Sequence, residues 1–325
     1  MTPRTILKKT LSTLTLIGFA FSVMSAQALT ISPARAELTG DPGETVSDSF
    51  LLINEQNADQ TFYTSVENFD SQGESGTPNF TAAKEGLPTW IQVTDKVTLK
   101  KGERIKVPYS VLIPKDADAG GHFAAIFLST VPPSATEGQV SVGAKVGMLV
   151  LLKVTGSIKE NGGLLTFTLK QENKVLTSLP IDFIYRFKND GNDRVKPEGD
   201  IVIKNTFGME TAHMDANTAM GNVLPGSVRR YEVHYGEKNA PESSAPFFEQ
   251  VKFQKDNFAF GIYTANLSLK FGNSGNAHSS LTYFMFPWQL ATVVFVVVLV
   301  IIILLVWMLK RYNRWIIKQA RAAAK

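Results

Sequence analysis

The sequence contains no cysteine among its 325 residues. Without cysteine the chain has no disulfide, no thiol nucleophile and no thiolate ligand for a metal ion. Its four histidines lie far apart and show no His-x-His or His-x-x-x-His spacing, so the sequence predicts no zinc site. The histidines are His122, His213, His234 and His278. The folded chain must therefore be stabilised by apolar cores.

The sequence also lacks the common motifs of enzymes and nucleotide-binding proteins. It has no P-loop, no G-x-G-x-x-G and no G-x-S-x-G nucleophile turn. The oxygen-rich segment Asn189–Asp193 lacks the alternating acids and the distal glutamate of an EF-hand loop, so it predicts a turn. We predict no catalytic residue, no cofactor and no nucleotide, and expect a protein that is not an enzyme.

The net charge of +4 does not indicate a nucleic-acid partner. Of the 33 basic residues, three lie in the first 28 residues and six lie after residue 309, which leaves 24 basic against 29 acidic residues in between. The central part of the chain is therefore mildly acidic. The basic character comes from the two ends, and no basic stripe with interleaved aromatic residues is present.

One long apolar run lies near the C-terminus. Leu290–Leu309 carries no charge, and about 20 helical residues cross the roughly 30 Å of a bilayer core. Tryptophan at each end of the run and a basic cluster after it are typical of a membrane anchor whose tail is cytoplasmic. We predict a span over residues 286–309 and a tail over 310–325. The anchoring residues predicted are Trp288, Trp307, Lys310, Arg311 and Arg314.

The first 28 residues have the features of a secretory signal peptide. A basic start precedes the short apolar run Leu11–Val23, and Ala26 and Ala28 supply the small residues expected before a cleavage site near Leu29. With one later span, this signal predicts a single-pass protein of the cell membrane, with about 258 residues outside the cell.

The predicted outer part is all-β. Short runs of β-branched and aromatic residues recur between turn signals, which is typical of antiparallel sandwiches. We predict two immunoglobulin-like β-sandwiches, at 29–156 and 157–285, with no helix before the membrane span. Asp70–Pro88 is interpreted as a loop, Trp90 as a core anchor, and His122 as a residue at the start of a strand.

Several segments, in their order and spacing, resemble the WxL-interacting surface proteins of bacteria. In the first half these are ISPAR, D-PGET, SFLLIN, LPTWIQV, VTLKKGERIKVPYSVLIPKDADAGGHFAAIF and VGMLVLLKVTG; in the second they are FKNDGNDRVKPEGDIVIKNTFG and NVLPGSVRRYEV. The resemblance covers essentially the whole chain. It implies two sandwiches with a membrane anchor, with peptidoglycan and a WxL-domain protein bound by the first domain and host or matrix proteins by the second.

Three functions remain open from the sequence. The first is a non-catalytic scaffold or binding protein at the cell surface, attached to peptidoglycan, to another surface protein, or to both. The second is a chaperone-like assembly accessory of the envelope that uses an open strand edge. The third and least favoured is an envelope hydrolase with a pair of carboxylates about 5–10 Å apart.

Overall fold

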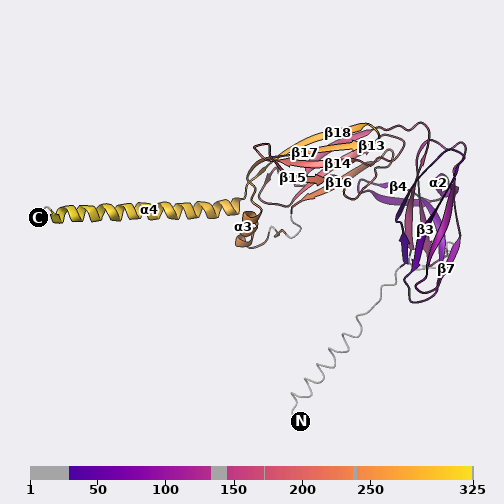
Figure 1. The fold of residues 1–325 in the computed structure, drawn as a ribbon, viewed down its shortest axis with the longest axis horizontal. Helices are drawn as coiled ribbons and strands as arrows, with labels where there is room; N and C mark the ends of the chain where they lie inside the picture. Colours follow the sequence, from indigo (N-terminus) through magenta and orange to yellow (C-terminus); the bar gives the residue numbers. More distant parts are fainter. Residues whose placement is uncertain (1–28, 133–144, 172, 237–239, 243, 324–325) are drawn as a thin grey trace, which may run out of the picture. The chain divides into compact units, whose positions relative to one another are not determined.

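The computed structural model describes residues 29–132, 145–171, 173–236, 240–242 and 244–323 (Figure 1). The chain divides into two units. The second unit comprises Ser71–Pro78 and everything from Ile158 onward, and the first comprises the rest. Each unit contains one β-sandwich. The predicted signal peptide, with Ala26 and Ala28, lies outside the described residues.

The first sandwich consists of two facing sheets. One has four strands in the order β1 (Leu29–Ser32), β3 (Thr45–Asn54), β8 (Arg104–Leu112) and β6 (Ile91–Val93). The other has the order β2 (Arg35–Gly40), β10 (Lys145–Val154), β9 (Gly120–Ser129), β4 (Gln60–Gln72) and β5 (Thr77–Ala82), with β7 (Lys96–Leu99) also paired to β4.

The core of the first sandwich follows from alternation along its strands. Successive side chains of a strand point to opposite faces, so every second residue of β8 faces inward. Val107, Tyr109 and Val111 are accordingly buried. They belong to one apolar cluster with Phe50 of β3 and Ile126 of β9. This cluster supplies the stability that disulfides provide in many exported domains.

Trp90 lies beside this core rather than at its centre. It ends the short helix α2 (Leu87–Trp90), is half-buried, and packs against the apolar cluster. Its ring centroid is 4.7 Å from that of His122, and the His122 Nε2 atom lies 2.8 Å from the Asp118 carbonyl oxygen. The histidine predicted at a strand start is therefore a packing partner of the tryptophan.

The second sandwich also has two sheets. One has three strands, β11 (Gly162–Leu169), β13 (Ile181–Asn189) and β16 (Val228–Tyr235). The other has the order β12 (Val175–Leu176), β18 (Gly275–Met285), β17 (Gly261–Phe271), β14 (Glu198–Lys204) and β15 (Glu210–Asp215). The prediction of two immunoglobulin-like sandwiches followed by an apolar helix is confirmed.

Two stacked tyrosines lie in the core of the second sandwich. The rings of Tyr185 and Tyr231 are 4.7 Å apart between centroids and tilted by 8°. Their hydroxyl groups donate hydrogen bonds to the carbonyl oxygens of Ala216 (2.9 Å) and Gly221 (2.8 Å). Burial raises the pKa of both phenols well above the ordinary value, because the apolar core disfavours the phenolate.

The prediction that no helix precedes the membrane span is wrong. Besides α2, the structure contains α3 (Phe247–Asp256), which precedes β17. The helical pattern of α3 is weak in the sequence because its buried inward residue is a glutamine, Gln254. Hydropathy alone places such a residue on the surface.

The interpretation of Asp70–Pro88 as a loop is also wrong, because β4 continues to Gln72 and Thr77–Ala82 forms β5. Gly73 and Gly76, both with positive φ, make the turn between these two strands.

The C-terminal helix is longer than predicted. Helix α4 runs from Trp288 to Ala323 and continues through the basic segment. Residues 288–323 include neither glycine nor proline, and the lysine, arginine and alanine residues near its end are good helix formers. The local sequence therefore contains no signal that would end the helix at residue 309.

The stacked tyrosines predict that the second sandwich loses stability at alkaline pH. An unfolded tyrosine ionises near pH 10, whereas Tyr185 and Tyr231 stay neutral in the folded state at that pH. Above about pH 10 the unfolded state therefore binds fewer protons, and the free energy of unfolding falls as pH rises. Denaturant unfolding of the full chain in detergent micelles, followed by circular dichroism at several pH values, measures this slope.

The variant Y185F tests whether Tyr185 contributes to this loss of stability at alkaline pH. It loses the hydrogen bond to Ala216, which costs about 1 kcal/mol at pH 7. It also removes one titrating group, so the alkaline slope becomes shallower by up to about 1.4 kcal/mol per pH unit. An unchanged slope in Y185F would show that the fall arises from other groups.

Candidate functional site

One strand of the first sandwich is paired along only part of one edge. Strand β10 pairs with β9 over its full length, Lys145 to Val154. On its other side β2 pairs with it in parallel from Leu149 onward. Within the part of the chain that the structure describes, no strand is paired with that side of residues 145–148, although β1 lies near β10. We call residues 145–148 the open half of β10.

The backbone of the open half presents hydrogen-bonding groups outward. The Leu149 N–H donates to the Ala34 carbonyl oxygen (2.9 Å) on the β2 side. Residues two apart along a strand direct their N–H and C=O groups to the same side. Lys145 and Gly147 therefore present theirs to the same side, where a further strand could accept and donate hydrogen bonds.

An aromatic surface lies next to this edge on the outer face of the sheet. Gly147 faces Phe127 of β9, and a Cβ atom at residue 147 would come within 2.5 Å of that ring, so the ring lies over the bare backbone. The Lys145 ammonium is 4.0 Å from the centroid of the Phe127 ring and 2.6 Å from the Glu67 carboxylate. The lysine side chain thus crosses the sheet face and does not extend from the edge.

Three further phenylalanines continue this surface. The ring centroids of Phe127 and Phe80 are 4.8 Å apart, those of Phe80 and Phe69 are 6.2 Å apart, and those of Phe69 and Phe123 are 5.7 Å apart. Phe80 is 38 % exposed. The four phenylalanines form an apolar surface that runs from β9 across β4 to β5, away from the open edge, and Phe127 is the member nearest to the unpaired backbone groups. We call it the outer aromatic row.

The other sheet edges in the described chain carry features that discourage strand addition. Strands β2, β15 and β16 bear charged residues, β5 contains Pro78, and β11 has a bulge at Leu165. Strands β1, β6, β7 and β12 are at most four residues long. The open half of β10 has one charge, and that charge is paired with Glu67. It is therefore the edge best suited to bind another chain.

Helix α4 contains the predicted anchoring residues. Trp288–Ile317 is long and apolar enough to cross a membrane. Trp288 begins the helix, with its ring 6.1 Å from that of Phe247. Near the other end the Arg311 guanidinium lies 5.3 Å from the Trp307 ring centroid. Lys310 and Arg314 lie on the same exposed helix.

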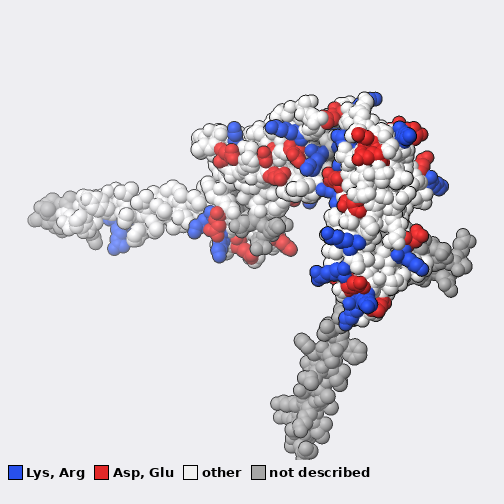
Figure 2. All heavy atoms as spheres, turned by 45° about the vertical axis from the view of Figure 1, so that its right-hand side comes forward, with Lys and Arg blue, Asp and Glu red and all other residues white. Residues whose placement is uncertain are grey.

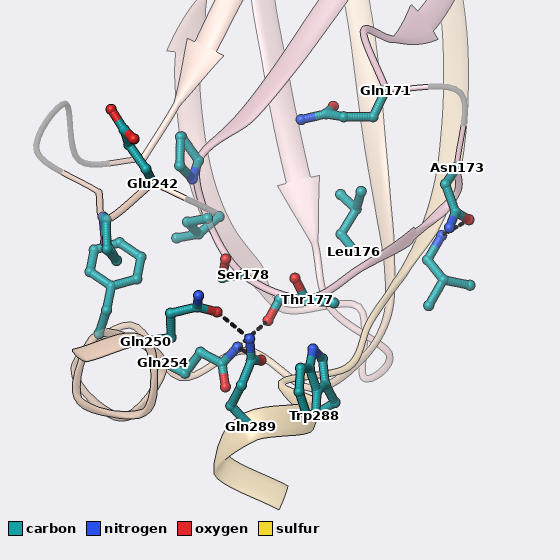
Figure 3. Close-up of a pocket in the computed structure, with 15 residues that line it drawn as sticks. Gln171, Asn173, Leu176, Thr177, Ser178, Glu242, Gln250, Gln254, Trp288 and Gln289 are labelled. Atoms are coloured by element: carbon teal, nitrogen blue, oxygen red, sulfur yellow. Dashed lines mark hydrogen bonds between the residues drawn. The ribbon is translucent and has the colours of Figure 1, made fainter. Parts of the chain in front are cut away.

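Three glutamines join α3 to the start of α4 (Figure 3). The Gln254 amide donates to Gln289 Oε1 (2.5 Å) and to the Thr177 carbonyl oxygen (3.1 Å), and its own oxygen accepts from the Leu290 N–H (3.0 Å). The Gln289 amide donates to Gln250. Gln254 thereby satisfies one of the N–H groups that the first turn of any helix leaves unpaired. We call these contacts the glutamine junction.

A cavity of about 560 Å³ lies beside the glutamine junction. It is lined by the β12 segment, by α3 and by Trp288 and Gln289 of α4 (Figure 3). Its lining is mostly amide, hydroxyl and aliphatic groups, with Glu242 as its one ionisable residue among the described lining residues. The cavity has no acid–base pair for chemistry, and we interpret it as space between the sandwich and the membrane helix.

The histidines do not converge. His234 Nδ1 lies 2.7 Å from Asp182 Oδ1, and His213 Nε2 lies 3.2 Å from Asp200 Oδ1. Both pairs are on exposed faces of the second sandwich. Among the described residues, no group of three or more His, Asp or Glu side chains could hold a metal ion.

Neither the open half of β10 nor the glutamine junction was predicted from the sequence. The sequence signal for the open half of β10 was an isolated glycine, Gly147, within a strand pattern. Such a glycine indicates close approach of another group to the backbone. Nothing in the sequence pairs Gln254 with Gln289, because they are 35 residues apart.

Comparisons with known proteins give the following results. No protein-family model and no curated protein matches the chain. Among solved structures, the class 5 fimbriae chaperone CfaA shows 13 % identity over 79 % of this chain and 99 % of its own, with a TM-score of 0.37. The E. coli chaperone DraB shows 10 % identity over 79 % and 97 %, with a TM-score of 0.34. The Salmonella enterica SafA pilin–SafB chaperone complex shows 11 % identity over 80 % and 99 %, with a TM-score of 0.36. No family assignment follows from these values.

The glutamine junction predicts that Q254A loosens the contact between α3 and α4. The change removes the three hydrogen bonds of the Gln254 side chain and leaves buried partners unsatisfied, at a cost of about 1–3 kcal/mol. We expect faster amide hydrogen exchange in α3 and the first turn of α4 for the full chain in lipid nanodiscs. K252A, an exposed change on the same helix, is the control and should leave exchange unchanged. Equal exchange in Q254A and the parent chain would show that the junction does not hold the helices together.

Proposed function

We propose that this chain is a membrane-anchored, non-catalytic binding protein of the cell envelope, which binds an extended segment of a protein partner along the open half of β10. The observation behind the proposal is the backbone of Lys145 and Gly147, unpaired in the described chain, with Phe127 of the outer aromatic row on the neighbouring strand. An added strand gains main-chain hydrogen bonds at such an edge, and specificity from alternate side chains.

The number of groups available suggests a short and selective contact. Four residues at the open half can bind a partner segment of similar length, and because Gly147 has no side chain, a partner side chain beside it could reach Phe127 on the next strand. Aromatic residues are enriched among those that dominate binding energy at protein interfaces. A partner with apolar residues at alternate positions fits this surface best.

The membrane anchor determines where this binding takes place. With the predicted signal peptide and the basic residues after Trp307, helix α4 would place both sandwiches outside the cell and the tail in the cytoplasm. The open half of β10 would then receive partners at the envelope.

Peptidoglycan and a WxL-domain protein stay predictions from the sequence resemblance. A WxL-domain protein is compatible with the proposal if it supplies an extended segment. No feature of the described surface favours a glycan polymer over a protein.

The proposal predicts that a photoreactive side chain at the open half captures a partner. We would introduce benzoylphenylalanine at Lys145 of the full chain in the cells that produce it, and identify crosslinked proteins by mass spectrometry. The matched control is the same residue at Lys153, on the part of β10 that β2 covers. Crosslinks to a defined peptide segment from position 145, absent from position 153, are the expected result.

A proline then tests the backbone contact. K145P removes the N–H group that faces the open side, whereas K145A keeps it and removes only the lysine contacts with Glu67 and Phe127. We expect partner binding to be lost in K145P and largely kept in K145A, with both variants folded by circular dichroism. Equal binding by K145P and K145A would rule out strand addition. Retention of the full chain on purified sacculi, unchanged in K145P, would instead support a scaffold that binds the wall through another surface.

A further inference from the structure

Most of the large apolar side chains exposed on the second sandwich lie at one end. Outside α4, thirteen large hydrophobic residues are exposed among the described residues. Nine of them belong to the end of the second sandwich from which α4 begins: Val175, Phe207, Met209, Phe247, Phe248, Phe258, Phe260, Ile262 and Phe286. We call these nine residues the apolar end. Phe207 is 83 % exposed and Phe248 is 77 % exposed, so they gain nothing from the core of the domain.

Strand pairing places these residues together. Gly261 at the start of β17 pairs with Met285 at the end of β18, three residues before the start of α4, so Phe260 and Phe286 lie side by side, with ring centroids 6.2 Å apart. The Thr206 hydroxyl donates to the Ile262 carbonyl oxygen and accepts from the Ile262 N–H, both at 3.0 Å. These bonds place the β14–β15 loop, with Phe207 and Met209, at the same end.

The apolar end is continuous with the membrane helix. The Phe247 ring lies 6.1 Å from that of Trp288, which is itself 45 % exposed and begins α4. The unbroken apolar run starts two residues later, at Leu290. Once α4 is in a bilayer, the end of the sandwich next to Trp288 lies at the depth of the lipid headgroups, where aromatic side chains are favoured.

The glutamine junction holds α3 in a defined position next to the start of α4. The Leu290 N–H bonds to Gln254 of α3, and Gln289 bonds to Gln250 of α3, so Phe247 and Phe248 on the same short helix are held next to the first turn of α4. A flexible linker would let the sandwich move away from the surface. Here the second sandwich is tied to the membrane helix by hydrogen bonds (Figure 3).

Charge indicates how the apolar end would meet lipid. Figure 2 shows mostly uncharged surface on the part of the second sandwich next to α4, with a small group of charged side chains of both signs beside the start of the helix. Helix α3 carries Glu249 and Asp256 as well as Lys252 and Lys255. With no excess of positive charge, attraction to anionic lipid is weak, and insertion of apolar side chains is the main contribution.

We propose that the apolar end is a lipid-docking surface: its aromatic side chains lie in the outer headgroup region of the bilayer that α4 crosses, and hold the second sandwich against the membrane. This inference rests on the proposed membrane anchoring. An apolar surface of this size on a water-exposed domain otherwise marks an aggregation or binding site. Its continuity with α4 identifies the bilayer as its occupant.

The absence of cysteine makes a direct test simple, because any introduced cysteine is a unique labelling site. Full-length single-cysteine variants F207C and F258C would carry the polarity-sensitive fluorophore NBD in phosphatidylcholine vesicles. The control S274C is exposed in the turn between β17 and β18, at the opposite end of those strands. L299C, at the middle of the apolar run, reports on insertion of α4.

We expect blue-shifted NBD emission at residues 207 and 258, quenched by lipids with a shallow doxyl group and little quenched by iodide. The fluorophore at residue 274 should be quenched by iodide, and that at 299 by lipids with a deep doxyl group. The same result with and without anionic lipid is expected, because the apolar end has no net positive charge.

Three other outcomes would overturn the inference, each in a different way. Iodide quenching at 207 and 258 equal to that at 274, with 299 in the hydrocarbon, would mean that the anchor inserts and the sandwich does not dock. Absence of lipid quenching at residue 299 would show that α4 does not insert into the bilayer, which contradicts the proposed membrane anchoring. Protection of 207 and 258 from both iodide and lipid would indicate a protein occupant. Energy transfer between differently labelled copies would then identify it as a second copy of this chain.

Discussion

Backbone hydrogen bonding is the constraint on which the rest of this structure depends. Every N–H and C=O group removed from water needs a partner, and the chain meets this need in two ways. Within the sandwiches the partners are neighbouring strands. In the apolar C-terminal segment only a helix can satisfy them, because lipid offers no partner. At the open half of β10 the described chain supplies none, and that difference makes residues 145–148 the natural place for another chain to bind.

The two helices near the C-terminus show how the same constraint links a sandwich to an anchor. The first N–H groups of α4 lack partners within the helix, and a side-chain oxygen of α3 supplies one of them. A buried glutamine is costly unless its amide is fully bonded, and Gln254 meets that condition with Thr177, Gln289 and Leu290. The polar contact therefore defines one geometry between α3 and α4, which apolar packing alone would specify less strictly.

Aromatic residues have two separate uses in the folded chain. In the cores they contribute to the packing that stabilises a chain without disulfides, as in the stacked pair Tyr185 and Tyr231. On the surface they gather in two places, the outer aromatic row of the first sandwich and the apolar end of the second. Phe69 of the outer aromatic row is buried and packs against its neighbours, whereas Phe207 and Phe248 of the apolar end are exposed and add little to the stability of their domain. The two groups are consistent with the two binding surfaces proposed, one for a protein segment and one for lipid.

The sequence by itself determined the all-β class and the apolar span, because alternation over short runs and a 20-residue uncharged run are local patterns. Val107, Tyr109 and Val111 alternate as a half-buried strand must, and Leu290–Leu309 is apolar whatever its surroundings. The absence of cysteine and of catalytic motifs was equally visible. Only the tertiary structure decided that β2 covers half of β10, that Gln254 is buried, and that Phe207 and Phe286 lie at one end. These features join residues far apart in the chain, and a one-dimensional pattern cannot show which distant residues supply a missing hydrogen bond or share a surface.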